Sequence, residues 1–284
     1  MTQTQLRTKL LVAAGLASAF LLTLSAAHAQ DYPVRLPDHV STQTFALGAT
    51  PFVKLSNING SISVTGDGGS QVRLVATEKI RAAAQDLATE AQREVTLKLT
   101  HTGDSLNAYV DGPFRGHRWE NPGYEVTFNF ELHVPRGASV DLGSVNGGVQ
   151  LTDVSGAFHT RTVNGGIRIQ GVAGAGSATT VNGKIVAVYV AQPAGDSSFH
   201  TVNGSVDVTL PRGVDARLRY KTFNGSIYTD FDVTPAPSDV EASSDSRGMR
   251  LFRHGRWADG QIGHGGPQLT FNTLNGSIYI RRAR

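Results

Sequence analysis

The chain has 284 residues, no cysteine, 32 glycines and 17% charged residues, whereas an average protein is about 25% charged. The absence of cysteine excludes disulfides, thiolate metal sites, cysteine nucleophiles and a lipid-modified N-terminal cysteine. Glycine exceeds its usual share of about 7%, while the 11 prolines are no excess. The composition therefore indicates a turn-rich chain that is neither collagen-like nor disordered.

The first 29 residues have the pattern of a secretory signal peptide. Arg7 and Lys9 precede an apolar run from Leu10 to Leu24, and residues 27–29 form a small-x-small cleavage signature. The apolar run is shorter than the roughly 20 residues that a transmembrane helix needs. We therefore expect cleavage after Ala29, export to the periplasm or the cell surface of a bacterium, and no integral membrane span in the exported chain.

Removal of this leader changes the charge of the chain. The leader contains two of the 26 basic residues and none of the 23 acidic ones, so the net charge falls from +3 to +1. A nearly neutral chain gives no support to nucleic-acid binding, which needs a clustered basic face. We therefore expect no nucleic-acid partner.

Seven Asn-Gly pairs mark a repeat. In the middle of the chain they follow one another at intervals of 18, 18, 21 and 21 residues, which is the signature of a repetitive β-structure. An apolar residue stands directly before each asparagine, and a β-branched aliphatic residue stands three positions after it. This pattern predicts short strands that flank a turn. The predicted corners are Asn59 and Gly60, Asn146 and Gly147, Asn164 and Gly165, Asn182 and Gly183, Asn203 and Gly204, Asn224 and Gly225, and Asn275 and Gly276.

Two arrangements of these strands are possible. A two-residue type I′ hairpin, which Asn-Gly usually signals, fails because it would pair an apolar residue with Gly, Ser or Lys. A hairpin with a four-residue loop would expose the seven apolar residues that precede asparagine, whereas a coil would bury each against its equivalent one coil away. We therefore expect an all-β fold with a β-helix-like solenoid of ~20-residue repeats, in which the asparagines hydrogen-bond as a ladder. An antiparallel β-meander or sandwich is the alternative.

The repeats also suggest a division into modules. Residues 30–122 read as a β-rich N-terminal module, and residues 123–284 as the repeat solenoid. A flexible insertion is expected at about 232–267, because residues 235–248 are rich in Pro, Ser and Asp. This insertion accounts for the 51 residues between Asn224 and Asn275.

One helix is expected in the N-terminal module, at about residues 78–95. Apolar residues recur there at helical spacing, and Thr77 is placed to cap the start. The residues that carry this spacing are Ile80, Ala84, Leu87, Ala91 and Val95.

Several segments of the chain together resemble a known family. They are the repeated T-V-N-G-x-I/V strings at 162–167, 180–185 and 201–206, the opening segment 53–64, the V-P-R-G boundary at 134–137 and the closing segment 274–278. The chain is similar to the bacterial putative-adhesin family of β-strand-repeat proteins, a domain family of unknown function. The resemblance covers about residues 45–284. It implies an exported, repetitive β-structure and suggests an adhesion or envelope role, and it brings no catalytic residues.

The sequence contains no recognisable catalytic or metal-binding constellation. No His-x-His or His-Glu-x-x-His spacing occurs, and His159 and His200 do not share a register in the repeat. Asp230 and Asp232 lack a third acidic neighbour at calcium-loop spacing. Four positions after each asparagine, where a β-helix enzyme would gather carboxylates, the residues form no acidic cluster. We expect no catalytic site, no cofactor and no metal.

Two similar segments, 114–119 and 252–257, contain both tryptophans. Arg118 with Trp119, and Arg256 with Trp257, are candidate binding residues, because guanidinium pairs with anionic groups and indole stacks on sugars. Alternatively, each tryptophan packs as a cap. The sequence thus favours an exported structural, adhesion-like or binding protein of the cell envelope, whose partner is an envelope polysaccharide or another envelope protein. A polysaccharide-binding or polysaccharide-cleaving protein on a β-helix scaffold and a periplasmic partner of an envelope-sensing system are the alternatives.

Overall fold

The computed structural model describes residues 32–114, 122–235, 242–244, 250–252 and 257–284. The expected signal peptide lies outside these residues. Residues Tyr32–Arg284 form one compact unit. Within the described ranges, no helix is long and apolar enough to cross a membrane.

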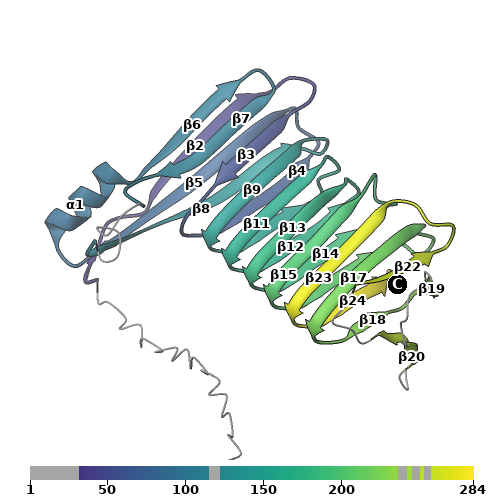
Figure 1. Cartoon of the computed structure of the whole chain (residues 1–284). Helices are drawn as coiled ribbons and strands as arrows, with labels where there is room; N and C mark the ends of the chain where they lie inside the picture. The colour runs from purple at the N-terminus through teal and green to yellow at the C-terminus, as the bar shows by residue number, and fades with distance from the viewer. Residues whose placement is uncertain (1–31, 115–121, 236–241, 245–249, 253–256) are drawn as a thin grey trace, which may run out of the picture. The chain divides into compact units, whose positions relative to one another are not determined.

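The described part of the chain is nearly all β, with two large mixed sheets that do not close (Figure 1). In spatial order, sheet A contains β1 (Val34–Arg35), β5 (Gln71–Ala82), β8 (Tyr124–Pro135), β4 (Ile62–Asp67), β10 (Val149–Thr152), β12 (Ile167–Val172), β14 (Ile185–Tyr189), β16 (Val206–Leu210), β24 (Ile278–Arg282), β18 (Ile227–Thr229), β21 (Arg250–Phe252) and β20 (Ala242–Ser244), with β2 (His39–Ala46) also paired to β5. Sheet B contains β19 (Val233–Pro235), β22 (Ala258–Ile262), β17 (Ala216–Asn224), β23 (Gln268–Asn275), β15 (Ser197–Asn203), β13 (Gly176–Asn182), β11 (Phe158–Asn164), β9 (Ser139–Asn146), β3 (Phe52–Ser56), β7 (Ser105–Asp111) and β6 (Thr96–Thr102).

The chain passes from sheet B to sheet A at each Asn-Gly pair. A strand of sheet B ends at or just before the asparagine, and a strand of sheet A starts three residues after it. Equivalent strands pair in parallel and in register, so that Asn164 lies opposite Asn146 on one side and Asn182 on the other. The repeats are therefore paired in parallel and not in an antiparallel meander, while two large open sheets are compatible with the sandwich alternative. Antiparallel pairs occur toward the ends of the sheets, as between β5 and β8, β6 and β7, and β17 and β22.

The last strands of the chain are not the last in space. Strand β23 lies between β15 and β17 in sheet B, and β24 lies between β16 and β18 in sheet A. Figure 1 shows this pair in yellow between green strands. The chain thus forms β17 and β18 one strand position beyond β15 and β16. Strands β23 and β24, which come later in the sequence, occupy the position in between. The sequence alone does not predict this order.

The core consists of the inward side chains of both sheets. Along β11 the buried and exposed residues alternate, which is the period of a strand with one buried face. The buried residues form one cluster that extends from Val53 through Leu142, Ile167 and Phe199 to Ile280. Two aromatic rings in this core, Phe199 and Phe271, stack with centroids 5.6 Å apart and so join β15 to the inserted β23.

The helix is shorter than the sequence predicts. Helix α1 spans Gln85–Glu94, and residues 78–82 are the end of β5. The apolar residues of this stretch alternate with polar ones, because Ile80 and Ala82 are buried on the core face of a strand. Thr77 is not the cap, since the helix begins after Ala84 and has no side-chain cap hydrogen bond.

The two expected modules share both sheets. Strands β3 and β4, from the segment 30–122, pair with β9 and β10, from the segment 123–284. The expected insertion at about 232–267 contributes β19 and β22 to sheet B and β20 and β21 to sheet A. Its described residues therefore extend the two sheets.

Candidate functional site

The seven asparagines of the corners form a continuous hydrogen-bonded ladder. The side-chain amide of each asparagine donates to the side-chain oxygen of its neighbour, at 2.8–2.9 Å, in the spatial order Asn59, Asn146, Asn164, Asn182, Asn203, Asn275, Asn224. At the Asn59 end of the ladder, the side-chain amide of Asn59 donates to the backbone oxygen of Val126. The sequence predicts such stacked amides, and in this structure they line one edge of the molecule.

Buried hydroxyls support the ladder from inside. Thr180, two positions before Asn182, is fully buried, and its hydroxyl donates to the backbone oxygen of Gly165 in the neighbouring repeat, at 2.9 Å. Thr162, Thr201, Thr222 and Thr273 make the equivalent bonds. A buried carbonyl that would otherwise lack a partner is satisfied in this way.

The corner glycines are required by close stacking. A Cβ on Gly165 would overlap with the backbone oxygen of Gly147, and one on Gly183 with that of Gly165. Of the seven corner glycines, Gly60 and Gly276 have positive φ, and the other five do not. Glycine is therefore needed at most corners because the neighbouring backbone leaves no room for a side chain.

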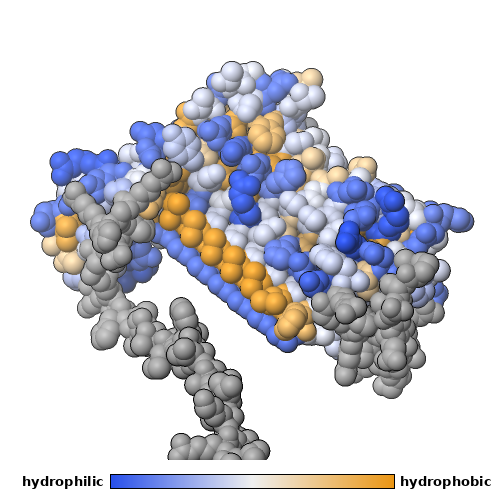
Figure 2. Space-filling model, viewed as in Figure 1, coloured by the Kyte–Doolittle hydropathy of each residue, from blue (hydrophilic) through white to orange (hydrophobic). Residues whose placement is uncertain are grey.

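An exposed row of apolar side chains runs beside the ladder. We call the residues directly before the asparagines the apolar row: in spatial order Ile58, Val145, Val163, Val181, Val202, Leu274 and Phe223. The sequence predicts that they are buried against one another, and this is wrong for five of the seven, whereas Ile58 and Val202 are half-buried. Val163 is 40% exposed, Leu274 46% and Phe223 63%, because the residues lie on the outer face of sheet B, next to the corner. Figure 2 shows the row as an orange line beside the blue line of asparagines.

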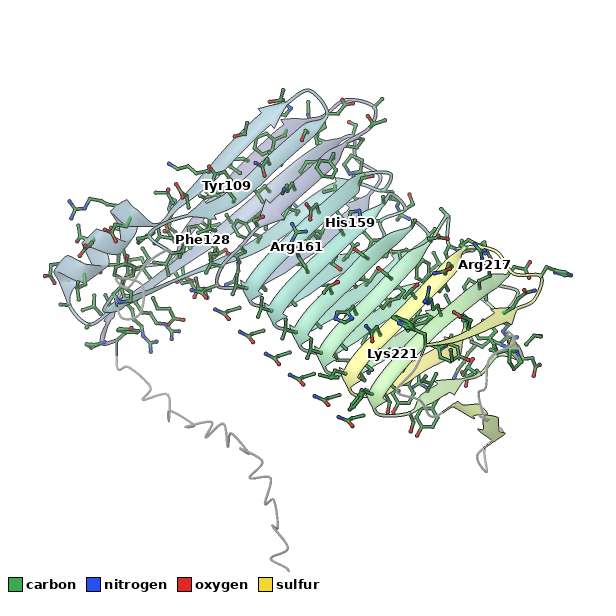
Figure 3. The ribbon with its side chains drawn as sticks, viewed as in Figure 1. Tyr109, Phe128, His159, Arg161, Arg217 and Lys221 are labelled. Carbon is green, nitrogen blue, oxygen red and sulfur yellow. The ribbon has the colours of Figure 1, made fainter. Side chains whose placement is uncertain are left out.

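Basic side chains accompany the apolar row on the same face of sheet B. Three and five positions before the asparagines, this face presents Lys54, Arg161, Arg219 and Lys221. Asp141 is the acidic residue at these two positions, and it is paired with Arg161 at 3.1 Å and with Lys54 at 3.7 Å. Figure 3 shows Arg161, Arg217 and Lys221 on the side of sheet B where the row lies. Arg219 in turn pairs with Asp259 of β22 at 3.8 Å, so the four cations are opposed by two carboxylates and the net charge beside the row is positive.

Trp257 joins this basic group at one end of sheet B. It is 37% exposed, and its ring lies 4.9 Å from the guanidinium carbon of Arg219 and 5.8 Å from Nζ of Lys221. The other candidate binding residues, Arg118, Trp119 and Arg256, lie outside the described residues. An open depression of about 520 Å³ adjoins the group and is lined by Arg217, Arg219, Asp259 and Gln261 among others.

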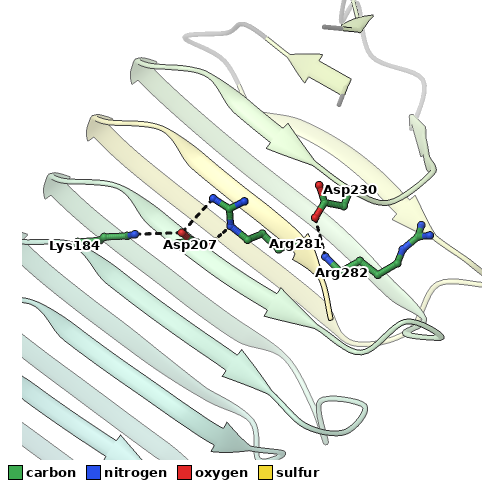
Figure 4. A network of polar contacts seen from close by, with 5 residues as sticks. All are labelled: Lys184, Asp207, Asp230, Arg281 and Arg282. Atoms are coloured by element: carbon green, nitrogen blue, oxygen red, sulfur yellow. Dashed lines mark hydrogen bonds and ion pairs between the residues drawn. The ribbon is translucent and has the colours of Figure 1, made fainter. Parts of the chain in front are cut away.

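The outer face of sheet A carries paired charges (Figure 4). Asp207 accepts from Arg281 Nε at 2.8 Å and from Lys184 Nζ at 3.2 Å. The hydrogen bond from Arg281 to Asp207 raises the pKa of the guanidinium. A carboxylate held between two cations is suited to joining strands. Asp230 accepts from the backbone N–H of Arg282 and so joins β18 to β24.

Two tyrosines stack on the same face. Tyr228 and Tyr279 have ring centroids 5.1 Å apart and an interplanar angle of 10°, and the guanidinium carbon of Arg281 lies 4.9 Å from the Tyr279 ring. Each ring is thus engaged with a neighbour, as in a cross-strand structural pair. Elsewhere on sheet A, a depression of about 380 Å³ lies over Gly148 and Gly166, with Arg168 on its rim.

Among the residues that the structure describes, no group of three or more His, Asp or Glu side chains could hold a metal ion. His159 shares a hydrogen bond with Ser177, at 2.9 Å, across β11 and β13. The features that the structure brings together at this edge are a ladder of amides, an apolar row and basic side chains beside it. The row was visible in the sequence as seven apolar residues at one register position, but their exposure was not.

No protein-family model matches the chain, and no curated protein matches it. Among solved structures, it is similar to a putative cell adhesion protein from Clostridium sporogenes, with 9% identity and a TM-score of 0.39 over 87% of this chain and 100% of that one. It is also similar to a putative adhesin from Bacteroides fragilis (8% identity, TM-score 0.26, 86% and 97% covered) and to a putative lipid binding protein from Parabacteroides distasonis (7% identity, TM-score 0.23, 86% and 97% covered). Likenesses of this extent carry no argument about a ligand.

Proposed function

We propose that the chain is an exported, non-catalytic binding protein of the bacterial cell envelope, that it is built as a β-helix-like solenoid, and that the apolar row is its binding surface. The observation that carries the proposal is the exposure of five residues of the row, which are Val145, Val163, Val181, Leu274 and Phe223. The signal-peptide pattern of residues 1–29 supports this location.

The parallel pairing supports the solenoid. Each repeat consists of a strand of sheet B, an Asn-Gly corner and a strand of sheet A, and it contacts its neighbours through both strands and through the ladder. Such repeats stabilise one another through contacts between neighbours, so the chain needs no disulfide in an oxidising compartment.

The apolar row exceeds what strand stability requires. β-Branched residues side by side on neighbouring strands contribute favourable contacts, which accounts in part for the valines. It does not account for Leu274 and Phe223, which leave 46% and 63% of their surface in water. Two positions earlier on the same face, Thr179 and Asn272 are paired within the same strands although their side chains are polar. The strands therefore do not require apolar residues on this face. A contiguous exposed apolar surface of this kind marks an interaction site.

A polysaccharide is the second candidate ligand, and Trp257 is the observation that favours it. Its partly exposed ring with Arg219 and Lys221 beside it offers stacking and charge together. This group lies at one end of sheet B, so the two candidates are separable by mutation.

The test is the retention of the protein in the cell envelope. We expect the double variant Val163→Ser, Val181→Ser to be released by osmotic shock, while the native protein and the control Val190→Ser stay with the envelope. Val190 is a suitable control because it is a valine 66% exposed outside the row. If the row variant fractionates as the native protein does, the row is not the binding surface. Loss of retention in Trp257→Ala alone would favour the polysaccharide.

A further inference from the structure

We infer that the apolar row binds the surface of an anionic lipid bilayer, with its side chains inserted at the interface and the basic residues of sheet B over the headgroups. This inference rests on the proposed function, because it takes the row as a binding surface and names what covers it.

The shape of the row suits a flat partner. Neighbouring strands lie about 4.8 Å apart, so seven residues on adjacent strands extend over roughly 29 Å in a straight line. The row lies where the chain turns from sheet B to the corner, and Figure 2 shows it running along this edge. The two depressions described above are lined by other residues. An edge of this kind contacts a planar surface along its whole length, whereas it cannot enclose a small ligand.

The charges beside the row complement an anionic surface. At the two outward positions next to it stand four cations, Lys54, Arg161, Arg219 and Lys221. Two carboxylates oppose them: Asp141 pairs with Arg161 and Lys54, and Asp259 of β22 pairs with Arg219 at 3.8 Å, so the net charge stays positive. The side chain of Asp141 is only 16% exposed, whereas that of Arg161 is 55% exposed. On the other side of the row stand the uncharged asparagine amides. Basic residues near an anionic leaflet each contribute to binding in a salt-dependent manner.

The residue types fit the depth of an interface. A single row of Val, Leu and Phe inserts shallowly, within the roughly 5–10 Å of the headgroup and acyl boundary. Its polar neighbours, such as Thr179 and Asn182, then remain among the headgroups. Trp257, with its partly exposed indole, stands at the end of sheet B beside Lys221, and tryptophan favours this region of a membrane. One row alone gives weak binding, so the charges are needed as well.

The experiment uses vesicles and the chain from Gln30 onward, since Tyr32–Arg284 is one compact unit and the leader would itself bind lipid. The chain has no cysteine, so Val181→Cys and Val190→Cys each provide one site for an environment-sensitive fluorophore. We expect vesicles of phosphatidylcholine with about 30% phosphatidylglycerol, which gives the surface a negative potential, to shift the emission at position 181 to the blue. The emission of the fluorophore at position 190 should not shift.

Variants separate the apolar and the electrostatic contributions. The pair Val163→Ser, Val181→Ser should abolish vesicle binding, and Lys221→Gln should weaken it about fivefold, with the loss reduced at high salt. Arg168→Gln is the matched control, because Arg168 is an exposed cation on sheet A, away from the row. Circular dichroism must show that each variant is folded. A folded row variant that still binds would overturn the inference, as would a label at position 181 that does not respond.

The outcome also distinguishes this inference from the proposed function. If vesicles do not bind but Val163→Ser, Val181→Ser still releases the protein from the envelope, the row is a binding surface for a protein or polysaccharide, and the membrane inference is wrong. If the row variant stays in the envelope and vesicles do not bind, both are wrong.

Discussion

The side chain of Asn224 donates a hydrogen bond of 2.8 Å to the side chain of Asn275, which follows it by 51 residues in the chain. Asn275 in turn donates to Asn203. The final repeat of the sequence is therefore the second to last in space, and it joins two parts of the molecule that would otherwise be separated in both sheets.

Deletion of residues 268–284 should prevent the formation of continuous sheets. The deletion removes the buried Leu269, Phe271, Ile278 and Ile280, whose burial is worth on the order of 6–12 kcal/mol in total. That is comparable with the whole stability of a typical domain, about 5–15 kcal/mol. Urea unfolding followed by circular dichroism should show the loss of the cooperative native transition.

A synthetic peptide of residues 268–284 tests whether this effect is specific. Added to the truncated chain, it should restore a cooperative transition, since its two strands have preformed partners on both sides. Deletion of Arg284 alone is the control and should leave the urea midpoint unchanged. A truncated chain that unfolds at the native midpoint would show that the inserted strands do not join the sheets.

The parallel strands and the ladder could be predicted from the sequence because they depend on register. An apolar residue three positions after every asparagine restricts which strand faces are inward, and Ile185 is buried as this rule requires. The insertion of β23 and β24 between earlier strands could not be predicted, since equivalent repeats fit one another in any order. The exposure of Val163 could not either, because a residue next to a corner can face inward or outward while the pattern stays the same.

Gly165→Ala should strongly destabilise the protein, by about 3 kcal/mol, because the new Cβ would overlap with the backbone oxygen of Gly147. The adjacent Gly166→Ala is the matched control. A Cβ at Gly166 would lie 3.3 Å from the oxygen of Lys184, and the equivalent position of the next repeat is occupied by Lys184 itself. Urea unfolding of both variants measures the difference. Equal destabilisation would argue against close stacking at the corner.

The ladder should be more sensitive in its middle than at its end. Asn182 donates to Asn164 and accepts from Asn203, whereas Asn224 donates one side-chain bond, to Asn275. Since a hydrogen bond contributes about 1 kcal/mol net, Asn182→Ala should cost about 2 kcal/mol and Asn224→Ala about 1 kcal/mol. The free energy of unfolding from urea titration tests this order. If the two losses are equal, neighbouring ladder bonds do not contribute separately.

Two buried tyrosines should make the fold sensitive to alkali. Burial raises the pKa of Tyr220 to about 12, with a smaller effect from the charge of Asp259, and burial also raises the pKa of Tyr189 to about 12. Each phenol has a pKa of 10.0 when unperturbed. Because the folded-state pKa is higher, the stabilisation is fully present below pH 10 and is lost as the pH rises through 12.

The variant Tyr220→Phe measures this contribution. A difference of two pKa units corresponds to about 3 kcal/mol, so the native protein should lose that much more stability than the variant between about pH 9 and 12. Stability is measured by urea unfolding at each pH, and phenol ionisation by its ultraviolet absorbance. Tyr228→Phe is the control, since Tyr228 lies on the outer face of sheet A, stacked on Tyr279. Parallel pH profiles of the native protein and Tyr220→Phe would show that Tyr220 does not stay neutral through burial.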